Sequence, residues 1–167
     1  MVACPSLTLP QKTLAIADDI AHPLDHFLDF QSFISQRNKT TAHQQNKPII
    51  NRVDFLKQIA HRLPEVATRI AESDFGDVHL EVGAMRRATQ NAIAERDFTT
   101  VRKHLHLVSD LFERANAELF KAICVSYLEA LFLGKTSAPH IEARCLLSRS
   151  MEHVLRHAEL DFERCCA

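Results

Sequence analysis

Two pairs of histidines have the spacing that brings metal ligands together on one face of a helix. His22 and His26 form the first pair, and His153 and His157 form the second. Residues four apart are neighbours on a helix surface, and two imidazoles make a metal site when a third ligand joins them. The second pair has further candidate ligands nearby in the sequence: Glu152, Cys165 and Cys166.

The histidine pairs also have an ordinary explanation. Ten histidines in 167 residues produce such spacings by chance, and neither pair has the His-Glu-x-x-His pattern of zinc proteases. We therefore expect solvated or partly packed histidines, with no bound metal and no other cofactor. A metal site at His153 and His157 is the alternative.

A single carboxylate, Glu129, lies in the most apolar stretch of the chain, KAICVSYLEALFLGK. At 100° per residue, one helix face collects the large apolar side chains of this stretch. The opposite face collects Glu118, Lys121, Val125 and Glu129. The pattern favours an exposed polar stripe. A buried carboxylate paired with an arginine or a helix end is the second interpretation, and a catalytic carboxylate is the third.

Other catalytic patterns are missing from the sequence. It has no Gly-x-Ser-x-Gly elbow and no phosphate-binding loop, and it has only three glycines. The number of cysteines is odd and their spacing matches no disulfide framework, which favours a reducing, cytoplasmic setting. The formal net charge is −1, and no apolar run reaches 18 residues. We therefore expect neither nucleic acid nor a membrane as partner.

Three segments are expected to position these residues. Residues 1–37 read as a tail and a helical arm, residues 38–48 as a polar linker, and residues 49–167 as the main helical domain. The arm carries more large apolar side chains than a free tail would expose. We predict that it binds a partner protein or a second copy of the chain through Leu24, Phe27, Phe30 and Phe33.

The main domain shows helix signals throughout. Asn51 and Asp54 have the spacing of a capping box, and Pro64 ends or kinks the helix that follows. A stripe with steps of three and four residues runs from Phe98 to Leu119, and Gly134 is a natural stop. A last helix is expected from Ser137 through residue 158. The prediction is an all-α fold, a helical bundle or short stack of five to six helices with an N-terminal arm.

A short motif occurs three times, as AESDF at residues 71–75, AERDF at 94–98 and AELDF at 158–162. We interpret it as a helix-boundary motif, in which Ala-Glu ends one helix, Asp caps the next and Phe enters the core. A true repeat array is the alternative.

The run Asp97–Glu129, which ends in Ser126-Tyr127-Leu128-Glu129, resembles small uncharacterised bacterial all-helical domains with a Ser-aromatic-Leu-Glu helix motif. The Leu63-Pro64-Glu65 segment is similar to a turn near the start of such domains. The resemblance covers about residues 50–133 and implies no catalytic residues.

These patterns predict a protein that binds another protein and is not an enzyme. An immunity protein or antitoxin that occludes a partner, such as a toxin, fits a well-filled core without recognisable chemistry. In the main domain, Glu118, Lys121 and Glu129 are the predicted partner-binding residues. The alternative is a metal-dependent enzyme or sensor that uses histidine and glutamate side chains. The apolar arm also makes a homodimer an expected arrangement.

Overall fold

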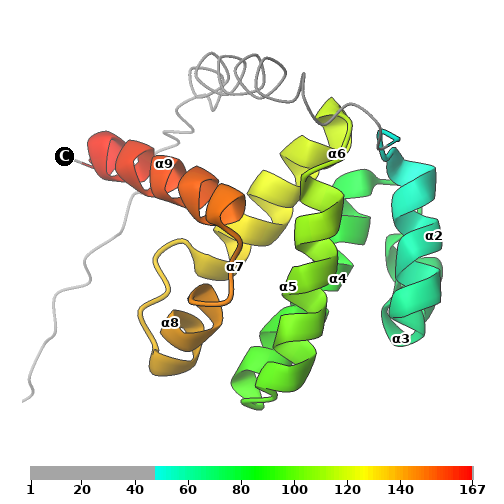
Figure 1. Ribbon diagram of the computed structural model, residues 1–167, viewed down its shortest axis with the longest axis horizontal. Coiled ribbons are helices and arrows are strands. Elements are labelled where there is room, and N and C mark those ends of the chain that lie inside the picture. Colours follow the sequence, from blue (N-terminus) through cyan, green and yellow to red (C-terminus); the bar gives the residue numbers. More distant parts are fainter. Residues whose placement is uncertain (1–47, 167) are drawn as a thin grey trace, which may run out of the picture. The chain divides into compact units, whose positions relative to one another are not determined.

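The computed structural model describes residues 48–166, which belong to one compact unit of the chain, Gln44–Ala167 (Figure 1). This part is mostly helical and contains no β-strand, which confirms the all-α prediction. The predicted arm, and the predicted linker except Pro48, lie outside the described residues. None of the described helices is both long and apolar enough to cross a membrane.

The elements, in chain order, are α2 (Arg52–Arg62), α3 (Pro64–Arg69), the π-helical segment η2 (Ile70–Asp74), α4 (Val78–Ala94), α5 (Phe98–Phe112), α6 (Ala117–Ala122), the π-helical segment η3 (Ile123–Glu129), α7 (Ala130–Phe132), α8 (Ala138–Arg144) and α9 (Arg149–Cys166).

The start of α2 forms the predicted capping box. The Asn51 side chain accepts a hydrogen bond from the Asp54 N–H at 3.1 Å, and the Asp54 carboxylate accepts one from the Asn51 N–H at 3.5 Å. Ile50 and Phe55, on either side of the cap, are both buried. This arrangement satisfies the first backbone donors of the helix and sets the angle at which the chain enters it.

Ile50 also ties the start of α2 to the turn between α5 and α6. Its N–H donates to the Arg114 carbonyl at 2.8 Å, and its carbonyl accepts from the Asn116 N–H at 2.8 Å. These two hydrogen bonds hold the N-terminal ends of α2 and α6 close together. Residues of both helices therefore contribute to one surface.

The prediction that the recurring motif marks a helix boundary is correct at only one of its three positions. Asp97 caps α5 and accepts from the Thr100 N–H at 3.1 Å, as predicted. Asp74 instead lies at the end of η2, Asp77 caps α4, and Phe75 is 71% exposed. The helix before Asp74 does not end at the expected alanine and glutamate, because it continues as a wider π-helical turn. The third copy lies inside α9.

The packing centres on α4, which contacts α5, α6, η3 and α8. The predicted apolar stripe of α5 is confirmed, with Phe98 only half-buried and the other members in the core: Val101, Leu105, Val108 and Phe112. The stripe breaks after α5, where Asn116 caps α6 by accepting from the Leu119 N–H. α6, η3 and α7 then follow one another directly until Gly134, whose φ of +69° ends the run as predicted.

The single last helix predicted from Ser137 is two helices in the structure. Figure 1 shows α8 and α9 as separate helices joined by a short turn. Ser148 starts the second helix, because its hydroxyl accepts a hydrogen bond from the Met151 N–H at 3.4 Å.

Candidate functional site

The predicted stripe on α6 and η3 is present, and its members differ in exposure. Glu118 is exposed, while Lys121 and Glu129 are half-buried. The opposite face is buried as predicted, through Phe120, Ile123, Tyr127, Leu128 and Leu131. Glu129 therefore lies at the edge of the core, between the exposed and the fully buried interpretations. The other predicted partner-binding residues lie outside the described part of the chain: Leu24, Phe27, Phe30 and Phe33.

A cluster of charged groups near this stripe is built around Arg52, in the first turn of α2. Its guanidinium donates two hydrogen bonds to the Glu81 carboxylate, from Nε at 2.8 Å and from Nη2 at 2.5 Å. Glu81 is fully buried, and it also accepts from the Gly76 N–H at 3.1 Å. A buried carboxylate needs such partners, because desolvation otherwise costs several kcal/mol.

Gly76 makes this geometry possible. Its φ of +118° lies in a region that other residues rarely adopt, and it lets the chain turn sharply between η2 and α4. The turn directs the Gly76 N–H toward Glu81 and leaves Phe75 on the surface.

The Phe75 ring lies over the Arg52 guanidinium, with 5.4 Å between Cζ and the ring centroid. This distance is within the range of a cation–π interaction. Hydrogen bonding to Glu81 raises the pKa of Arg52, and the nearby carboxylates of Glu118 and Asp77 act in the same direction. The surface at this point therefore consists of a held aromatic ring above a cation, with two carboxylates nearby.

Further exposed apolar side chains occur on neighbouring elements of the fold. They come from the start of α2, from α4 and from η3: Ile49, Val53, Leu80 and Val125. His79 holds α4 to η3, because its Nδ1 lies 2.8 Å from the Ser126 Oγ. We define the Arg52 face as Arg52, Phe75, Asp77 and Glu118.

Sequence reasoning missed most of this face. Arg52 and Glu81 are 29 positions apart, and no local pattern relates them. The AESDF motif predicts a helix start, and therefore predicts Phe75 in the core. The available signal was Gly76, since a glycine directly after a phenylalanine indicates a turn that can leave the ring outside.

The histidine pair of α9 joins no larger set of metal ligands among the side chains that the structure describes. His153 and His157 are both exposed, with ring centroids 4.6 Å apart in an edge-on arrangement. Among residues 48–166, no three histidine, cysteine, aspartate or glutamate residues are grouped to hold a metal ion. His22 and His26 lie outside the described residues, as do the side chains of Cys165 and Cys166.

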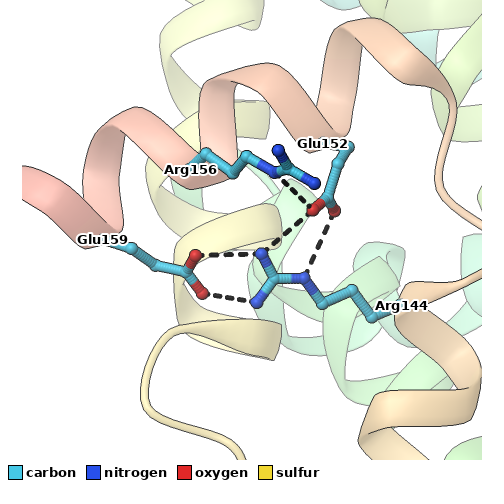
Figure 2. A network of polar contacts seen from close by, with 4 residues as sticks. All are labelled: Arg144, Glu152, Arg156 and Glu159. Atoms are coloured by element: carbon cyan, nitrogen blue, oxygen red, sulfur yellow. Dashed lines mark hydrogen bonds and ion pairs between the residues drawn. The ribbon is translucent and has the colours of Figure 1, made fainter.

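Glu152, a candidate ligand, takes part in an ion network instead. Figure 2 shows the Arg144 guanidinium of α8 between the carboxylates of Glu152 and Glu159 of α9, with Arg156 as a second donor to Glu152. Burial opposes ionisation of Glu152, but hydrogen bonds from Arg144 and Arg156 outweigh it and lower the pKa of the carboxyl. The network therefore fastens α8 to α9.

A second polar group lies inside the core, where η3 meets α4 and α5. The Thr89 Oγ1 lies 3.0 Å from the Met85 carbonyl, 2.9 Å from the Tyr127 hydroxyl and 3.2 Å from the His104 Nδ1. Thr89 has one proton, so it donates to Met85 and accepts from the other two groups. His104 then carries its proton on Nδ1, and its buried Nε2 has no hydrogen-bond partner among the described residues.

Acidification is expected to destabilise the protein through His104. Burial lowers the pKa of His104, although Glu65 and Asp97 act in the opposite direction. An unfolded histidine has a pKa of about 6.5. Below that pH the unfolded chain binds a proton that the folded chain does not bind. The contribution of neutral His104 to the free energy of unfolding is therefore fully present above pH ~6.5 and decreases as the pH falls.

Urea unfolding at a series of pH values measures this effect. The variant His104→Gln should flatten the acid side of the profile. His61→Gln, at an exposed position on α2, is the matched control and should keep the wild-type slope. An unchanged slope in His104→Gln would show that other groups cause the acid sensitivity.

The model of one protein family matches residues 56–162, and the family is described as a domain of unknown function, DUF7674. No curated protein and no solved structure matches the chain significantly.

Proposed function

The chain belongs to the DUF7674 family, and since that family has no assigned function, we propose from the geometry of the Arg52 face that this is a non-enzymatic protein-binding protein. The observation that carries the proposal is the exposed Phe75 ring, held over Arg52 and bordered by Asp77 and Glu118. The proposed mode of action is occlusion of a site on the partner, as in an immunity protein or antitoxin.

An exposed phenylalanine is a suitable anchor when its position is fixed. Aromatic residues and arginine are enriched in the cores of protein interfaces, where a few of them supply most of the binding energy. Arg52 is held by its two hydrogen bonds to buried Glu81, and it in turn supports the Phe75 ring. A side chain that is already ordered loses less conformational freedom on binding than a mobile one.

The charges around the ring indicate the chemistry of the partner. Asp77 and Glu118 are both exposed and lie near Arg52, which is largely neutralised by Glu81. The net charge of the exposed groups on the Arg52 face is therefore negative. We propose a partner with an apolar pocket bordered by lysine or arginine, because complementary charges speed association and exclude other partners.

Further elements of the proposed interaction surface are the rest of the stripe and the N-terminal arm. Lys121 and Glu129 extend from Glu118 along α6 and η3. The arm residues Leu24, Phe27, Phe30 and Phe33 are proposed to add apolar contacts, within a helical bundle that carries the arm as an appendage.

Site-specific photocrosslinking in the organism that encodes the chain tests the proposal. The photoreactive residue p-benzoylphenylalanine is placed at position 75, and at exposed Arg149 as a control. We expect one discrete protein adduct from position 75 and none from position 149. Glu118→Lys should reduce the adduct by about tenfold, because it places a positive charge against a basic partner.

Glu118→Asp retains the charge and should retain the adduct. The proposal fails if position 75 gives no adduct, if position 149 gives the same adduct, or if the adduct is insensitive to Glu118→Lys.

A further inference from the structure

A separate surface of the molecule forms a groove between the end of α2 and residues 98–107 of α5. It has a volume of about 560 Å³. Leu63 and Leu107 lie in its lining with buried side chains, and half-buried Phe98 adds an aromatic ring. The groove thus offers apolar contact between two helices. Its other lining residues include three cationic side chains, Arg62, Arg102 and Lys103.

The positive charges of this groove are only partly neutralised. Arg62 Nη1 lies 3.1 Å from the Asp110 carboxylate, and His106 Nδ1 lies 3.6 Å from the same group. Arg102 and Lys103 are exposed, and neither forms a salt bridge within residues 48–166. Two cations that form no salt bridge in the described part of the chain therefore border an apolar lining.

We infer that this groove binds an acidic amphipathic helix of a partner protein. Grooves between helices bind such segments through apolar side chains spaced three and four residues apart. Those side chains would contact Leu63, Phe98 and Leu107, while glutamate or aspartate on the flanks of the segment faces Arg102 and Lys103. Opposite charges bring the segment to the groove and fix its orientation there.

This inference is independent of the Arg52 face. The two surfaces share no residue, and their exposed charges have opposite signs. One surface selects a basic partner and the other an acidic segment.

Fluorescence anisotropy with three designed peptides tests the inference on the full chain. The first peptide has leucines spaced three and four residues apart and glutamates at the flanking positions. The second replaces the glutamates by lysine, and the third replaces the leucines by serine. We expect the first peptide to bind at least about tenfold more tightly than either of the others, because it alone supplies both contacts.

Protein variants then locate the binding. Arg102→Glu combined with Lys103→Glu should weaken the first peptide by at least about tenfold. Lys135→Glu combined with Arg149→Glu makes the same change in net charge at exposed positions that do not line the groove, and should have little effect. Thr99→Trp places a large side chain in the groove and should abolish binding without a change of charge.

Circular dichroism confirms that each variant is folded. The inference is overturned if the peptides bind equally, if none binds at about millimolar concentration, or if the control variant weakens binding as much as the groove variant. Preferential binding of the lysine peptide would also overturn it.

Discussion

Replacing Arg52 by methionine is expected to lower the melting temperature by roughly 10 °C or more. Methionine keeps much of the length and apolar body of arginine, but it leaves the Glu81 carboxylate without its two strongest donors. Glu81 is fully buried, whereas the Arg52 side chain is about a third exposed, so the main cost of the change is the unpaired carboxylate. Removal of the partner of a buried carboxylate is strongly destabilising, because it leaves a buried charge unpaired. Thermal unfolding followed by circular dichroism measures the effect.

The same helix provides the control. Arg62→Met breaks a salt bridge to Asp110 in which both side chains are about 40% exposed, and water can solvate the remaining carboxylate. That change should shift the melting temperature by only a few degrees. Arg52→Met with Glu81→Leu should recover much of the lost stability, because no unpaired charge remains buried. Equal shifts in the two single variants would contradict the structural role assigned to Arg52.

Thr89→Val is expected to destabilise the protein by about 3 kcal/mol. Valine has nearly the same shape as threonine, so packing changes little. Its methyl group cannot accept a hydrogen bond, however, and the Tyr127 hydroxyl and His104 Nδ1 would lose their common acceptor. Each buried donor left without a partner costs about 1–3 kcal/mol. Equilibrium unfolding in urea measures the difference.

Tyr127→Phe separates the loss of a hydrogen bond from the cost of a buried donor that has no acceptor. It removes the donor and leaves no buried polar group behind on residue 127, so a loss of about 1 kcal/mol is expected. Thr99→Val, on the exposed surface of α5, controls for the threonine-to-valine change itself and should be nearly neutral. If Thr89→Val costs no more than Tyr127→Phe, the shared acceptor has no special role.

Local features of this fold could be predicted from the sequence because their causes lie within a few residues. The capping box of Asn51, the Asp97 cap, the stripe of α5 and the stop at Gly134 each depend on side chains one or two turns apart. The apolar face of α6 and η3 could be predicted for the same reason. Helical periodicity alone separates its buried members from Glu118.

The Arg52 face could not be predicted, because its members become neighbours only through tertiary packing. Arg52, Phe75 and Glu118 come from three parts of the chain. The two hydrogen bonds of Ile50 bring the start of α2 close to the start of α6, and no sequence pattern indicates that pairing. The division of the last helix at Ser148 was missed for a different reason, since the apolar spacing continues through the turn.

The two π-helical segments have a consequence for how this chain can change over evolutionary time. Each π-turn closes its hydrogen bonds over five residues where an α-helix uses four, so it contains one residue more than an α-helical turn requires. A one-residue deletion within η3 can therefore be absorbed by conversion to an ordinary α-helix. The same deletion in the middle of α4 or α5 would rotate every later side chain by about 100° and move core residues to the surface. Single-residue length differences among members of the family should thus concentrate in residues 70–74 and 123–129, where the helices hold a spare residue.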